Sequence, residues 1–148
     1  MASSTPNVVV IQINGDARPI FEKKSSAAVT PGALLTIGAT TLAENSTAAK
    51  TGNFLKAVAV ENPYAPDPTA SALSQDYASG DTVRYVFPQP GDMLYCWLKS
   101  GGNVAYGATL ETATNGELQA TSTGAVVAVA EEAVDASGGV KRIKVRFV

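Results

Sequence analysis

The stretch that decides the fold is SGGNVAYGATLETATNGELQ, residues 100–119, in which short apolar runs alternate with turns. Its two leucines, Leu110 and Leu118, flank an Asn-Gly pair that is typical of a β-hairpin turn. A two-residue turn would place the two leucines on opposite faces of the sheet. A three-residue loop at 114–116 pairs Thr112 with Leu118 and places both leucines in the core, so we predict that loop.

This register has further consequences for the hairpin. Leu110 pairs with Ala120, and Gly116 takes the left-handed conformation that ends the loop in a bulge. The polar side chains of the two strands then face water; they are Glu111, Glu117 and Gln119.

The rest of the second half also alternates like strands. Three side chains of the run 81–87 share one face: Val83, Tyr85 and Phe87. The run 93–98 and the start of 125–134 are apolar on both faces, which predicts central strands. Alternation is strictest in 140–148, where one face carries Ile143, Val145 and Phe147 and the other carries Arg142, Lys144 and Arg146.

The first half is less regular. Strand candidates are 8–13, 31–37 and 54–62, and a proline-rich loop is expected at 62–70. The window 69–79 could give one helical turn. The pattern V-x-x-G-A-x-L occurs at 29–35 and again at 104–110, where it could mark two similar strand-entry corners of one barrel. We predict an all-β protein with little helix, because its turns recur at intervals near those of sandwiches and barrels.

The composition of the chain limits the classes of partner that it can bind. The chain has 148 residues, which suits one domain, and only 16% of them are charged, with a net charge of −2. A neutral surface of small side chains suits contact with protein and speaks against a nucleic-acid partner. The beginning of the chain has no basic region and only four consecutive apolar residues, so we expect neither a signal peptide nor a membrane partner.

The residues needed for most chemistry are missing. There is no histidine, so no Ser–His or Cys–His nucleophile and no imidazole metal ligand can form. The single cysteine, Cys96, lies among large apolar residues and is expected to be a buried core thiol. The acidic group Glu131, Glu132 and Asp135 is better explained as a solvated turn than as a calcium site. We therefore expect no enzyme activity, no catalytic residue, no metal and no cofactor.

The N-terminal segment has two interpretations. Residues 1–15 could begin with an ordinary first strand, or they could form an arm that adds to a neighbour's sheet, ahead of a barrel domain at 16–148. In the second interpretation the segment binds a partner through its β-branched side chains, which are Val8, Val9, Val10, Ile11 and Ile13.

The basic face of the last strand has several interpretations, of which the first is favoured. Arg142, Lys144 and Arg146 could form the solvated face of an edge strand, where basic side chains discourage aggregation. They could instead dock on an acidic partner surface. Nucleic acid is a third option, weakened because no exposed aromatic residues alternate with the charges.

Two resemblances follow from these motifs. Residues 101–118 are similar to the strand–turn–strand frame of lipoyl and biotinyl carrier domains, but no lysine lies at the hairpin tip, so the carrier function is unsupported. From Thr82 to Val148, the motifs PGD, NVAYGATL, NGEL, VAVAEEAVD and RIKVRFV follow in an order that resembles head decoration, or cement, proteins of tailed bacteriophages.

The second resemblance implies a small β-barrel or β-tulip-like domain with an extended N-terminal arm. It also implies a structural virion protein, made in the bacterial cytoplasm, on the outer surface of an icosahedral capsid. It implies a major capsid protein as partner, with bridging of its neighbouring copies, and assembly of this chain into a homotrimer or a homodimer. Alternatives are a head-fibre or tail-associated β module and, more distantly, a carbohydrate-binding β domain.

Overall fold

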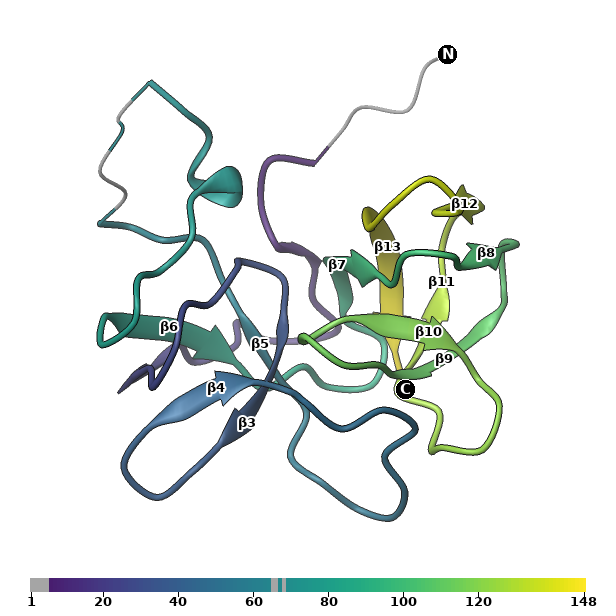
Figure 1. The fold of residues 1–148 in the computed structure, drawn as a ribbon, viewed down its shortest axis with the longest axis horizontal. Coiled ribbons are helices and arrows are strands. Elements are labelled where there is room, and N and C mark those ends of the chain that lie inside the picture. The colour runs from purple at the N-terminus through teal and green to yellow at the C-terminus, as the bar shows by residue number, and fades with distance from the viewer. Residues whose placement is uncertain (1–5, 65–66, 68) are drawn as a thin grey trace.

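In the computed structural model, which describes residues 6–64, 67 and 69–148, the chain is built almost wholly from short strands (Figure 1). The helix within that part is a single 3₁₀ turn at Ala72–Ser74, which confirms the helical turn expected in 69–79. The all-β prediction is therefore confirmed. No helix of the described residues has the length and apolar character to cross a membrane.

The first half of the chain folds into a five-stranded sheet in the order β2-β6-β5-β3-β4. A parallel bridge from Ser25 to Leu42 joins the two outer strands, so the sheet closes on itself as a first barrel. Its strands are β2 (Phe21–Lys24), β3 (Leu34–Ile37), β4 (Leu42–Glu44), β5 (Ala57–Ala59) and β6 (Thr82–Val86).

The second half forms a second closed barrel in the order β7-β10-β9-β11-β13, with β13 pairing back onto β7. A short pair, β8 (Asn103–Val104) with β12 (Val134–Asp135), covers one end. The barrel strands are β7 (Met93–Leu98), β9 (Thr109–Thr112), β10 (Leu118–Ala120), β11 (Ala128–Ala130) and β13 (Lys141–Phe147). Figure 1 shows the two barrels side by side, with β3 to β6 on the left and β7 to β13 on the right.

The two barrels share one topology. Strands β2, β3, β4, β5 and β6 correspond in order to β7, β9, β10, β11 and β13, and every pairing of the first barrel recurs in the second with the same direction. In each, four antiparallel pairings are closed by one parallel contact. The chain is therefore a tandem repeat of one five-stranded unit.

The register of the two units also agrees. Where the first barrel closes, the Ser26 N–H donates to the Leu42 carbonyl at 2.9 Å. Where the second closes, the Lys99 N–H donates to the Leu118 carbonyl, also at 2.9 Å. Within the barrels, the Val60 N–H donates to the Arg84 carbonyl, and the equivalent Glu131 N–H donates to the Lys144 carbonyl, each at 2.9 Å.

The repeated V-x-x-G-A-x-L pattern marks the turn that enters β3 in one unit and β9 in the other. The prediction that it marks similar strand entries is confirmed. The prediction that both belong to one barrel is wrong, because the second entry begins a separate closed sheet.

The predicted hairpin register is confirmed. Thr112 pairs with Leu118 and Leu110 pairs with Ala120, and both leucines are fully buried. Gly116 has a φ of +70°. The expected exposure of Glu111 is wrong, because that side chain is completely buried under residues that follow the hairpin.

The last strand is confirmed, with Ile143, Val145 and Phe147 buried in the core of the second barrel. Its interpretation as an edge strand is wrong, since β13 lies between β7 and β11. The run 93–98 is confirmed as a central strand, with β13 on one side and both β1 and β10 on the other.

Candidate interaction surfaces

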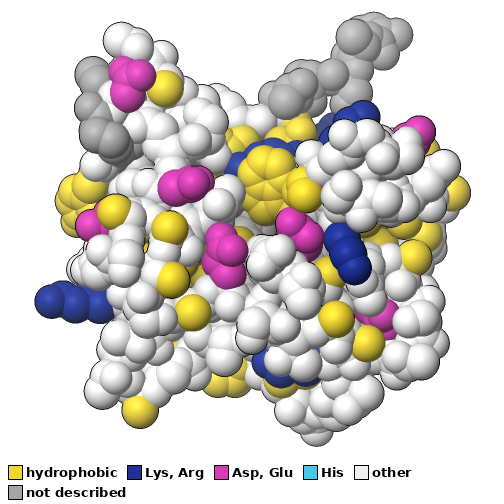
Figure 2. Space-filling view, viewed as in Figure 1, with side chains coloured by type: hydrophobic (Ala, Val, Ile, Leu, Met, Phe, Trp, Pro, Cys, Tyr) yellow, Lys and Arg dark blue, Asp and Glu magenta, His cyan; other side chains and the backbone are white. Residues whose placement is uncertain are grey.

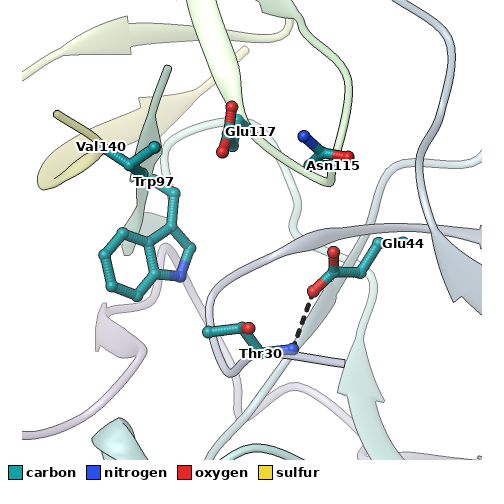
Figure 3. A pocket seen from close by; sticks show the side chains of 6 residues that line it. All are labelled: Thr30, Glu44, Trp97, Asn115, Glu117 and Val140. Carbon is teal, nitrogen blue, oxygen red and sulfur yellow. Dashed lines mark hydrogen bonds between the residues drawn. The ribbon is translucent and has the colours of Figure 1, made fainter. Parts of the chain in front are cut away.

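A cleft of about 300 Å³ lies where the two barrels meet. In Figure 3, Trp97 and Val140 face Thr30 and Glu44 across this space, with Asn115 and Glu117 above it. Figure 2, viewed as in Figure 1, shows a hydrophobic patch near the middle of the molecule, with acidic side chains beside it. The cleft is therefore an aromatic surface with an acidic rim, formed only because the two units pack together.

Trp97 is held in place by contacts across the repeat. Its indole N–H donates to the Pro31 carbonyl at 3.0 Å. The Arg142 guanidinium stacks 4.1 Å from the centre of the indole ring and also lies 5.4 Å from the Tyr95 ring. Trp, Tyr and Arg are the residue types most enriched at energetically important contact sites.

Arg142 also joins the barrels through hydrogen bonds. Its guanidinium donates to the carbonyls of Pro31 at 2.9 Å, Leu73 at 2.7 Å and Tyr95 at 3.3 Å. Burial lowers the pKa of this guanidinium from its ordinary value. Arg142 is thus engaged inside the molecule, and the sequence could not show this because its acceptors are carbonyl groups distant along the chain.

The carboxylates on the rim are partly desolvated. Burial raises the pKa of both Glu44 and Glu117 above the ordinary value. Glu44 accepts a hydrogen bond from the Thr30 N–H at 2.8 Å, which fixes its position but does not neutralise it. The rim is therefore suited to a donor-bearing or basic partner group.

The other two basic residues of the last strand have acidic neighbours. Arg146 pairs with Glu131, and the Lys144 ammonium lies 4.0 Å from Glu132. The positive charges of Lys144 and Arg146 on β13 are therefore balanced by carboxylates of the same chain. Glu131 and Glu132, expected as a solvated acidic turn, are the balancing groups.

The N-terminal strand β1 (Val10–Gln12) lies along β7 of the same chain. The Tyr95 N–H donates to the Val9 carbonyl at 2.7 Å, and the Val9 side chain is completely buried in a hydrophobic cluster that contains residues of both barrels. The Val9 N–H donates to the Glu61 carboxylate. Val8 is 42% exposed, whereas Val10, Ile11 and Ile13 are half-buried.

Segment 14–18 is anchored by one buried carboxylate, Asp92. It accepts hydrogen bonds from the Asn14 N–H at 2.8 Å and the Gln89 N–H at 2.9 Å, and it pairs with Arg18 at 2.7 Å. Burial by itself raises the pKa of Asp92, but these bonds, led by that from Arg18, outweigh burial and lower it.

Glu111 is a second buried carboxylate that sequence reasoning missed. It accepts hydrogen bonds from Gln119 at 2.8 Å, Ser122 at 2.9 Å and the Gly124 N–H at 2.5 Å. Burial by itself raises its pKa, but the hydrogen bonds outweigh burial and hold the pKa at about 2. Two of its donors, Ser122 and Gly124, lie just after the hairpin. The polar run after Ala120 was therefore the feature of the sequence that could have indicated a buried Glu111.

The described residues contain no group of three or more His, Cys, Asp or Glu placed to hold a metal ion. Cys96 is completely buried, as expected, and burial raises the pKa of its thiol to about 12. A thiol with that pKa is almost wholly protonated at neutral pH, so it does not act as a nucleophile.

The solved structures with a similar fold include the crystal structure of the head fiber gp8.5 N base in bacteriophage phi29. The TM-score is 0.61 at 12% sequence identity. In fold, the chain is similar to a phage head-fibre base. The match covers 89% of this chain and 95% of that one, so the head-fibre base shares parts of both barrels.

The sequence itself matches no protein-family model. It also matches no curated protein. The likeness to the head-fibre base is therefore a likeness of fold and not of sequence. It covers more of the chain than one barrel.

Proposed function

We propose that the chain is a structural virion module that attaches to the outside of a phage head, as the base of a fibre or protrusion. The observation that carries this proposal is the fold likeness, which runs over nearly the full length of both proteins. It favours a head-fibre base over a cement protein that bridges neighbouring major capsid proteins.

The proposed contact residues are those with exposed surface. From the N-terminal segment these are Val8, Val10, Ile11 and Ile13, and from the last strand Lys144 and Arg146. Val9 and Arg142 were also predicted as contact residues, but we leave them out of the proposal. The Val9 side chain is buried, and the Arg142 guanidinium donates to a carbonyl of the same chain. We propose assembly as a homotrimer, with a homodimer as the alternative, as the resemblance to decoration proteins implies. Several weak contacts on a lattice would then raise the net affinity by about 10²–10⁴.

The test mixes the purified protein with emptied heads of the phage that encodes it, and images the heads by electron cryomicroscopy. The expected result is density at regular lattice points. Heads that remain bare at saturating protein would overturn the proposal. A parallel measurement of the head disruption temperature separates the two structural roles, because a cement protein raises it and a fibre base leaves it unchanged.

A further inference from the structure

The tandem repeat exposes a difference between its two units. In the second barrel, strand β1 covers the start of the free edge of β7, with Val10 opposite Leu94 and Gln12 opposite Met93. The matched registers make Leu94 and Met93 of β7 equivalent to Phe21 and Ile20 at the start of β2. No strand lies on that edge of β2 in the described part of the chain.

The backbone of this edge is ready to pair. Tyr95 is the β7 residue whose N–H donates to Val9, the residue just before β1, and its equivalent on β2 is Glu22. Alternation along an antiparallel ladder turns the Glu22 N–H away from β6, as it turns the Tyr95 N–H away from β13. Edge groups of this kind are the usual template for strand addition.

The side chains at this edge are also left uncovered. Leu94 is 1% exposed, whereas its equivalent Phe21 is 42% exposed. Phe147 is 1% exposed, whereas its equivalent Phe87 is only half-buried. At the covered edge, Val10 of β1 lies opposite Leu94 and packs against the hydrophobic core.

The uncovered side chains form a defined surface. The Phe21 ring lies 5.2 Å from the Phe87 ring and 5.9 Å from the Tyr85 ring, and Ile20 beside them is 49% exposed. A groove of about 380 Å³ runs along this cluster. The residues that line it are Arg18, Pro19, Phe21, Phe87 and Gln89.

We propose that the β2 edge at residues 20–22 binds an extended segment of a different protein, which adds to the first barrel as β1 adds to the second. The segment runs antiparallel to β2 and carries β-branched apolar residues, because Val8 to Ile11 has that chemistry at the equivalent edge. A second copy of this chain is disfavoured, since a run of four β-branched residues occurs once in the sequence and is already seated on β7.

The experiment uses the full chain, labelled with ¹⁵N, and a synthetic peptide of residues 6–14 as the probe. We expect the peptide to shift the amide resonances of residues 20–22 and to slow hydrogen exchange at Glu22 more than tenfold. Shifts confined to Tyr95 and its neighbours would show exchange with β1 and would overturn the proposal, as would no binding at millimolar peptide.

Two matched variants sharpen the test. Glu22→Pro removes the outward N–H at an edge position where proline is tolerated, and it should weaken peptide binding at least tenfold. Glu22→Gln loses the same ion pair with Arg84 but keeps the N–H, so it should bind like the wild type. Equal binding by the two variants would overturn strand addition.

Ile20→Asp provides an independent check, because this exposed position is not needed for the core and the change should still weaken binding. Sedimentation of the unliganded chain tests whether a second copy of the chain occupies this edge instead. A dimer in which the Glu22 amide is protected would assign the edge to that second copy, and it would overturn the assignment to a different protein. No phage head enters these assays, so they can fail or succeed independently of the proposed function.

Discussion

Gly32 and Gly107 occupy the same position in the two barrels. The Gly32 N–H donates to the Ala59 carbonyl and the Gly107 N–H donates to the Ala130 carbonyl, each at 2.8 Å. Both glycines have positive φ, of +92° and +84°. The two glycines share this backbone geometry but differ in what surrounds them, which makes them a matched pair for measuring the contact between the barrels.

Replacing each glycine with alanine should therefore give unequal effects. Gly107→Ala meets open space and should cost only the left-handed strain, about 1–2 kcal/mol. In Gly32→Ala the new Cβ would lie 2.7 Å from the Tyr95 carbonyl and 2.7 Å from the Arg142 guanidinium, so we expect a further cost of about 1–3 kcal/mol. Urea unfolding measures both, and equal losses would contradict a tight contact between the barrels.

The buried Glu111 should be essential to the second barrel. Glu111→Leu removes the acceptor of several donors that stay buried, and we expect a loss of about 3 kcal/mol or more in the free energy of unfolding. Glu117→Gln on the same hairpin is the control. It should leave stability nearly unchanged or raise it slightly, because burial already disfavours the charge of Glu117.

Stability should fall as the solution becomes acidic. The pKa of Glu111 is about 2 in the folded chain against 4.5 ordinarily, so its contribution is complete above pH 4.5 and is lost as the pH falls toward 2. Asp92, whose pKa is also lowered, acts in the same direction. Urea unfolding from pH 6 to pH 2 should show the decline, and Glu111→Gln should flatten it; an unchanged slope would argue against the charged Glu111.

Arg142 should stabilise the chain rather than serve as a free basic group. Arg142→Lys keeps a charge but cannot reach the Pro31 and Leu73 carbonyls together or stack on Trp97 as a plane, so we expect a loss of about 1–3 kcal/mol. Thermal unfolding and Trp97 fluorescence should both change. A loss of stability that disappears in high salt would indicate simple surface electrostatics instead.

Neighbouring valines should separate folding from attachment. Val9→Asp places a charge in the buried hydrophobic cluster that both barrels share, and it should unfold or strongly destabilise the chain. Val8→Asp changes a side chain that is 42% exposed, so the fold should survive while binding to phage heads weakens if the segment contacts them. Unchanged head binding by the Val8 variant would restrict the segment to its role as a first strand.

The sequence by itself determined the strands whose side chains alternate and the hairpin whose loop length sets its register. These are local properties, since the two-residue period and the Asn-Gly turn each depend on a few adjacent residues. Leu110, Leu118 and the buried side of β13 were assigned correctly for that reason.

Only the tertiary structure decided which strands are neighbours. Whether β13 lies at an edge, whether Arg142 meets solvent or a distant carbonyl, and whether Glu111 is covered all depend on chain segments far apart in the sequence. The repeat is hidden for the same reason. Topology and backbone register are kept by backbone hydrogen bonds, which every residue except proline can donate, so the two barrels agree in structure where their sequences share little beyond V-x-x-G-A-x-L.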